Sequence, residues 1–156
     1  MHAIAPALYR LALALWVGGM SVFSFVVTPV IFRTQTREAA GRIVGAIFPV
    51  YFRFCLLAAG LALAARALAG MAFSGARQLA GTALIVFSVA ILAYHTYGLA
   101  PRMAAVRETI HAREAVPDDD PARREFARLH GVSMTLNLVV IAAGAVLILG
   151  YDSFRK

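Results

Sequence analysis

The stretch QLAGTALIVFSVAILAYHTYGLAP, from Gln78 to Pro101, contains no charged residue. It lies between Arg77 and Arg102 and is 24 residues long. About 20 apolar residues in a helix, each adding about 1.5 Å, cross the ~30 Å hydrocarbon core of a bilayer. This stretch therefore predicts a transmembrane helix. It indicates that the chain is a membrane protein.

Two further uncharged stretches predict transmembrane helices on the same grounds. One of 22 residues lies between Arg10 and Arg33, and one of 21 residues lies between His130 and Asp152. Over the whole chain of 156 residues, 61% are hydrophobic and 15% are charged. A soluble domain has about a quarter of its residues charged. The composition therefore favours a protein whose mass is nearly all within the membrane.

A fourth apolar run, from Ile43 to Ala65, is interrupted by Arg53. Because its neighbours are predicted to lie in lipid, we interpret this run as a span that carries an intramembrane or interfacial arginine. The sequence thus predicts an all-α integral membrane protein, a single domain over 1–156. Its four-transmembrane-helix bundle is expected to have spans at about 6–32, 43–68, 78–99 and 121–151.

The connection between the third and fourth spans is the only sizeable soluble part. Pro101 suits the first position of a helix, and a helix is predicted from there to Val116. Its apolar stripe and its arginines favour a short cytoplasmic helix lying in the membrane interface, although a helix packed on the end of the bundle fits equally well. Asp120 is a good N-cap with Pro121 after it, so the fourth helix is predicted to begin there.

The basic residues predict the orientation. With four spans, both termini lie on one side, which holds five Lys and Arg residues, while the other side holds nine: Arg33, Arg37, Arg42, Arg102, Arg107, Arg113, Arg123, Arg124 and Arg128. Basic loops stay in the cytoplasm, so both termini are expected outside a bacterial inner membrane. The net charge of +7 arises from these loop residues, and nucleic-acid binding is not expected.

Polar residues within the spans are costly and usually face protein or a cavity. Their depths place them all in the cytoplasmic half of the bilayer. On the fourth span they follow one helical stripe, with His130, Ser133 and Asn137 at i, i+3 and i+7. Gly81, Ser88 and His95 recur every seven residues on the third. The predicted ligand-binding or pathway cluster consists of Thr28, Tyr51, Arg53, His95, His130, Ser133 and Asn137.

Several kinds of chemistry are open to this cluster. Interfacial histidines and tyrosines can be anchors with a purely structural role. His95 and His130 on facing helices are candidate ligands of haem or a transition metal, with Met134 and Cys55 as soft ligands. No cofactor is firmly predicted, since no second-shell carboxylate lies in the spans. An enzyme is not expected, because no Asp or Glu base lies there and no Ser–His pair is indicated.

Three short motifs resemble one family. They are Leu15-Trp-Val-Gly-Gly19, Phe48-Pro-Val-Tyr51, and Phe126-Ala-Arg-Leu-His-Gly-Val-Ser133 followed by Asn137. Together they are similar to bacterial members of the transmembrane protein 205-like family, also known as domain of unknown function 4149. The resemblance implies a small four-helix membrane protein, and a eukaryotic relative linked to platinum-drug resistance suggests efflux or trafficking. The motif residues that carry over are Pro49, Tyr51, Arg128, His130, Gly131, Ser133 and Asn137.

From these observations we expect a small binding or transport component for a metal ion or small solute. Arg53 argues against a bare cation, which leaves an anionic ligand as a variant. The alternatives are an assembly or quality-control partner of another membrane complex, and a haem-binding membrane protein. Four helices make a thin wall for a solute path, so a homo-oligomer or another membrane protein is the expected partner besides the lipid bilayer.

Overall fold

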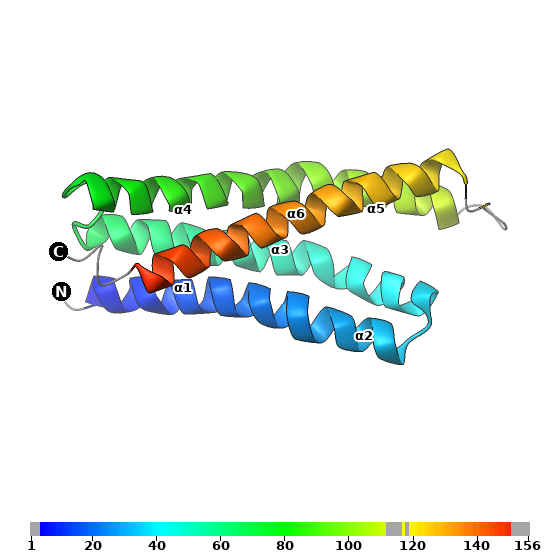
Figure 1. Cartoon of the computed structure of the whole chain (residues 1–156), viewed down its shortest axis with the longest axis horizontal. Helices are drawn as coiled ribbons and strands as arrows, with labels where there is room; N and C mark the ends of the chain where they lie inside the picture. Colours follow the sequence, from blue (N-terminus) through cyan, green and yellow to red (C-terminus); the bar gives the residue numbers. More distant parts are fainter. Residues whose placement is uncertain (1–3, 112–116, 118, 151–156) are drawn as a thin grey trace.

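The computed structural model describes residues 4–111, 117 and 119–150, and all regular structure in this part of the chain is helical. Four long helices run side by side (Figure 1). The first combines α1 (Ile4–Val22), the π-helical turn η1 (Phe23–Val27) and α2 (Thr28–Thr34), and the second is α3 (Arg37–Leu68). The third combines α4 (Ala76–Tyr94), the π-helical turn η2 (His95–Leu99) and α5 (Ala100–His111), and the fourth is α6 (Pro121–Leu149).

All four long helices are long and apolar enough to cross a membrane, as the sequence predicts. Their ends follow local signals. The Thr36 side chain accepts a hydrogen bond from the Ala39 N–H at 3.3 Å, so α3 begins at Arg37, six residues earlier than expected. The Asp120 carboxylate caps α6 at the Ala122 N–H, which confirms the predicted start at Pro121. The predicted end of that span, Tyr151, lies outside the described residues.

The segment from Ala100 to His111 is helical, but it continues the third long helix without a break (Figure 1). The expectation of a separate helix that begins at Pro101 is therefore wrong for the described residues. Proline usually disrupts a helix because it lacks an N–H group and its ring crowds the preceding turn. Here the wider π-helical turn η2 comes directly before it and accommodates the ring. The predicted end at Val116 lies outside the described part.

Each long helix packs against two others around a shared core, in the order α1, α3, α4 and α6. The buried face of α3 carries alanines at 58, 59, 62 and 65, which let its neighbours approach closely. Trp16, Met20 and Ile85 fill the space between the helices. A Cβ on Gly144 would overlap the Val17 side chain, so α6 and α1 are also close here. The outer surface is rich in exposed apolar side chains such as Leu57 and Leu149.

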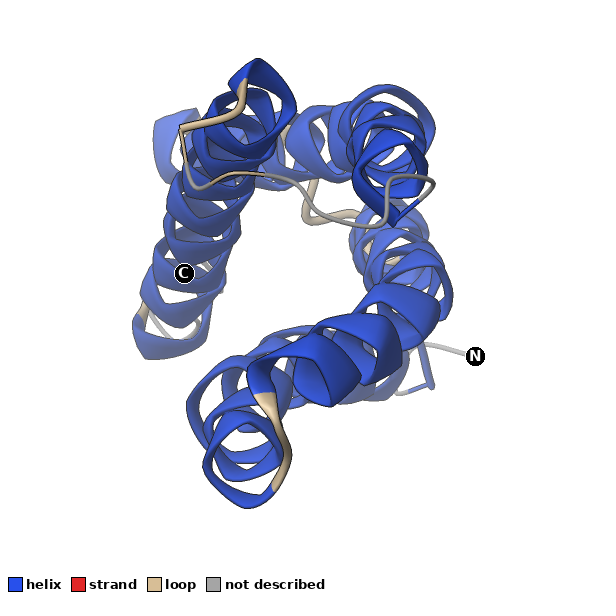
Figure 2. Ribbon diagram, turned by 90° about the vertical axis from the view of Figure 1, so that its right-hand side faces the viewer, coloured by secondary structure: helices blue, strands red, loops and turns tan. Residues whose placement is uncertain are grey.

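The two ends of the bundle differ. At one end, called the terminal end, α1 begins, α6 ends and α3 turns into α4 through Gly70, whose φ of +68° favours glycine. At the other end, called the α2–α5 end, the helices separate into the pair α2–α3 and the pair α5–α6 (Figures 1 and 2). Among the described elements, α2 packs only against η1 and α3. The candidate site lies between these two pairs.

Candidate functional site

A cavity of about 370 Å³ opens at the α2–α5 end, within the size range of small-molecule sites. Five of the seven predicted site residues line it: Thr28, Tyr51, His130, Ser133 and Asn137. They come from the first, second and fourth long helices. On α6, the lining runs from Phe126 to Leu138, about 18 Å along the helix. The sequence therefore predicts most of the polar lining, including the stripe on α6.

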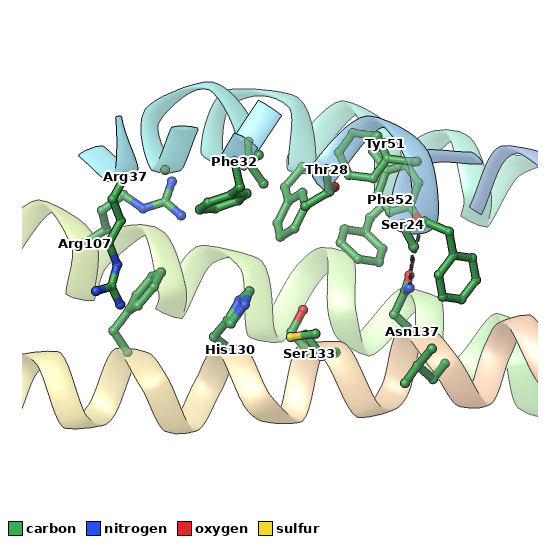
Figure 3. A pocket seen from close by; sticks show the side chains of 18 residues that line it. Ser24, Thr28, Phe32, Arg37, Tyr51, Phe52, Arg107, His130, Ser133 and Asn137 are labelled. Atoms are coloured by element: carbon green, nitrogen blue, oxygen red, sulfur yellow. Dashed lines mark hydrogen bonds between the residues drawn. The ribbon is translucent and has the colours of Figure 1, made fainter. Parts of the chain in front are cut away.

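Two arginines stand at one end of the cavity, Arg37 from α3 and Arg107 from α5 (Figure 3). No Asp or Glu occurs among the described residues that line the cavity. Neither arginine has an ion pair or a hydrogen bond in the described part of the chain. The described lining of the cavity thus carries two positive charges and no carboxylate. This end is called the arginine mouth.

The fold holds Arg107 in a defined place. Its guanidinium lies over the ring of Phe126, 5.3 Å from the ring centroid. On the other side it lies against α3, where a Cβ on Gly45 would overlap it. Only glycine leaves this space free, so α3 and α6 together orient the charge toward the cavity.

The opposite end of the cavity is closed by a chain of hydrogen bonds across three helices. The Tyr51 hydroxyl donates to Asn137 Oδ1 at 3.0 Å, and Asn137 Nδ2 donates to Ser24 Oγ at 2.8 Å (Figure 3). The Tyr51 ring also stacks on Phe23, with centroids 4.4 Å apart. Ser24 and Phe23 lie in η1. This polar chain joins η1, α3 and α6 and forms the floor of the cavity.

We expect Asn137→Ala to lower the free energy of unfolding by about 1 kcal/mol, because hydrogen bonds between membrane helices are worth roughly 0.6–2 kcal/mol. Unfolding in mixed micelles with increasing dodecyl sulfate measures the change. Thr135→Ala is the matched control on α6, since the exposed Thr135 hydroxyl bonds only its own helix, at Gly131 O. Equal stability of the two variants would contradict a structural role for the polar floor.

His95 lies behind the cavity wall and is 1% exposed. Its Nε2 is 2.6 Å from Ser133 Oγ, and its ring stacks on Phe52 with centroids 3.5 Å apart. No Ser–His pair was predicted from the sequence, and the contact of His95 with Ser133 corrects this. His95 Nδ1 has no hydrogen-bond partner among the described residues, so no third group orients the imidazole as catalytic triads require. The pair fixes η2 against α6.

The two histidines occupy different environments. His130 lines the cavity and lies parallel to the Phe126 ring, with centroids 6.1 Å apart, whereas His95 does not line it. The described residues contain no group of three or more His, Cys, Asp or Glu side chains able to hold a metal ion. Of the predicted soft ligands, Met134 lines the cavity and Cys55 is buried in the core. The described structure thus places no third such side chain with His95 and His130 to complete a metal site.

Arg53 does not join the cluster. Its side chain is exposed, and it lies outside the cavity lining. The buried arginine is instead Arg66, near the terminal end, which is 0% exposed. Arg66 donates hydrogen bonds to Thr82 Oγ1 at 3.0 Å, to the Tyr9 hydroxyl at 3.3 Å and to Gln78 O at 2.9 Å. It joins α1, α3 and α4 far along the bundle from the cavity.

Three residues of the cavity lining were not predicted from the sequence as site residues: Ser24, Arg37 and Arg107. From the sequence, the two arginines were used only to predict the orientation of the chain in the membrane. A usable signal existed for Arg107, because it lies four residues after the apolar Met103 and hence on the same helical face. Met103 is buried against Leu99 and Leu129. Ser24 offered the same signal, because it lies four residues before the predicted site residue Thr28.

The chain has relatives. The profile of a family described as "Domain of unknown function (DUF4149)" matches residues 11–112, from α1 through α5. A protein of Aquifex aeolicus (strain VF5), named only as an uncharacterized protein, is 30% identical over 145 residues, which are 90% of this chain and 95% of that protein. No solved structure matches the chain. The family match covers most of the helices around the cavity, and the chain belongs to the DUF4149 family.

Proposed function

We propose that the protein is a multi-pass membrane protein that binds a small anionic ligand in the cavity at the α2–α5 end, as a binding or transport component. One observation carries this proposal: the arginine mouth presents Arg37 and Arg107 to a cavity whose described lining holds no carboxylate. An unpaired arginine in an apolar setting is stabilised by an anion, to which its guanidinium can donate two parallel hydrogen bonds.

The setting of this site is proposed from the helices and the charges. Four long apolar helices with exposed leucines and phenylalanines suit a lipid environment. The basic residues at the α2–α5 end, eight of them in the described part of the chain, favour the cytoplasmic side of a bacterial inner membrane, with both termini outside. The cavity would then open to the cytoplasm, with α5 near the interface. The motifs on α1, α3 and α6 support membership among bacterial transmembrane protein 205-like proteins.

The charges favour an anion over a metal ion. A cation in the cavity would meet two guanidinium groups, and like charges at close range are repulsive. His130 and Ser133 line the same space and offer hydrogen bonds to an anion beyond the mouth. The floor of Ser24, Tyr51 and Asn137 closes the cavity, and the core beyond it is packed. Transport across the whole bilayer would therefore need a change in the helices, a second copy or another membrane protein.

A pair of ligands with the same hexyl chain and headgroups of opposite charge tests the proposal. Hexyl phosphate is expected to raise the melting temperature of the protein in a neutral detergent, because a ligand that binds only the folded state stabilises it. Hexyltrimethylammonium, with the same chain, is expected to have no such effect. Equal stabilisation by both ligands, or by the cation alone, would contradict an anion site. If neither stabilises the protein, the role of assembly partner becomes the better hypothesis.

A further inference from the structure

We propose that the natural ligand is an acidic membrane lipid, which reaches the cavity sideways from the bilayer. Its anionic headgroup lies between Arg37 and Arg107, and its chain lies along α6. This inference rests on the anion site proposed above and adds the class of ligand and its route.

The wall of the cavity is mainly apolar, and six of its 18 lining residues are phenylalanines. Phe23, Phe25, Phe32, Phe48, Phe52 and Phe126 line it between the arginine mouth and the polar floor. A small water-soluble anion loses hydration beside the phenylalanine rings of such a wall. The hydroxyl and amide groups of the floor already bond one another, so they demand no polar partner from a ligand. An apolar chain attached to an anionic group matches both parts of the lining.

One side of the cavity is open between α2 and α6. These two helices do not pack against each other in the described structure. Four apolar lining residues are exposed along the opening, which is called the α2–α6 slot: Phe25 at 60%, Phe32 at 47%, Met134 at 55% and Leu138 at 49%. In a membrane, side chains exposed on this outer face meet lipid rather than water. The slot therefore gives an acyl chain a path between the bilayer and the cavity.

The direction of the cavity matches the orientation of a lipid in one leaflet. The arginine mouth lies at the α2–α5 end of the bundle, where headgroups would be, and the lining extends from Arg37 and Arg107 to Asn137 (Figure 3). The lining spans about 18 Å along α6, and one half of a hydrocarbon core measures roughly 15 Å. Arginines near the headgroup level attract acidic lipids. Headgroup and chain would thus both lie at their ordinary depths.

Photo-crosslinking in vesicles tests the inference. The protein is reconstituted in phosphatidylcholine vesicles with a small fraction of phosphatidylglycerol whose acyl chain carries a diazirine. After irradiation, crosslinks mapped by mass spectrometry are expected at Phe25, Phe32, Met134 and Leu138, at least fivefold above those at Leu57 and Val86, which are exposed apolar residues outside the cavity. The same diazirine chain on phosphatidylcholine is expected to show no such preference.

A matched pair of variants adds a control for the headgroup. Arg37→Gln is expected to lower the crosslinks in the slot at least threefold. Arg33→Gln removes the same charge from the same end of the bundle, and Arg33 does not line the cavity, so its pattern should match that of the original protein. An equal loss in both variants would mean that surface charge alone concentrates the lipid, and it would overturn the inference.

The outcomes separate this inference from the anion site itself. If the two diazirine lipids label the slot equally, the cavity does not select charge, and both proposals fail. If neither lipid labels the slot while hexyl phosphate still stabilises the protein, the anion site stands and the lipid inference fails. If excess inorganic phosphate removes the phosphatidylglycerol crosslinks at a concentration at which chloride does not, the site prefers a soluble anion, which also overturns the inference.

Discussion

Arg107→Gln is expected to raise the dissociation constant for hexyl phosphate by roughly ten- to a hundredfold. Hydrogen bonds to charged groups contribute about 1.5–3 kcal/mol, and each 1.4 kcal/mol is a factor of ten in affinity. Arg107 should account for the larger part of the mouth's affinity, because Phe126 and the free space at Gly45 hold its guanidinium in place, whereas Arg37 is exposed. Titration calorimetry in a neutral detergent measures the constant.

Gly45→Ala tests whether the position of the Arg107 guanidinium matters for binding, because it leaves the charge in place. The added methyl group would overlap the Arg107 guanidinium, which must then move away from α3. We expect part of the affinity for hexyl phosphate to be lost. Gly60→Ala is the matched control, because Gly60 lies on the same helix and a Cβ there would meet nothing within 4 Å. If Gly45→Ala binds hexyl phosphate like Gly60→Ala, the placement of Arg107 does not contribute to binding.

The four long helices could be predicted from the sequence because lipid imposes a simple rule, namely a long stretch without charge. The stretch from Gln78 to Pro101 satisfies it without further argument. The continuation of the third long helix through α5 could not be predicted in this way. Pro101 ordinarily marks the start of a helix, yet the third long helix continues through it directly after the π-helical turn η2. Such a turn depends on packing against the neighbouring helices, which the local sequence does not encode.

On α6, the spacing of polar residues along the helix was enough to predict which side chains line the site. On α3, the same spacing was not used, and the buried arginine was not predicted. On α3 the buried positions Phe52, Cys55, Ala59 and Ala62 follow spacings of three and four, and the next position in that series is Arg66. Arg53 falls outside the series. Arg53 was selected because of its expected depth in the membrane. The spacing of buried residues along α3 instead predicts Arg66 as the buried arginine.

Arg66→Met is expected to lower the free energy of unfolding by about 3 kcal/mol. Met keeps most of the side-chain volume but removes the donors that bond Thr82, Tyr9 and Gln78 O, and hydrogen bonds to a charged group contribute about 1.5–3 kcal/mol. The contact of the guanidinium with the Tyr9 ring, 5.5 Å from the centroid, is lost as well. Unfolding in mixed micelles with dodecyl sulfate measures the loss.

Arg53→Met is the matched control for this prediction, since it makes the same change on the same helix at an exposed position outside the cavity. It should shift the free energy of unfolding by no more than about 0.5 kcal/mol. Because Arg66 lies at the terminal end, the folded fraction of Arg66→Met should still bind hexyl phosphate with unchanged affinity. Comparable destabilisation by both variants would show that any arginine in α3 contributes through its charge alone. A loss of affinity in Arg66→Met would show that the buried arginine also shapes the cavity at the opposite end.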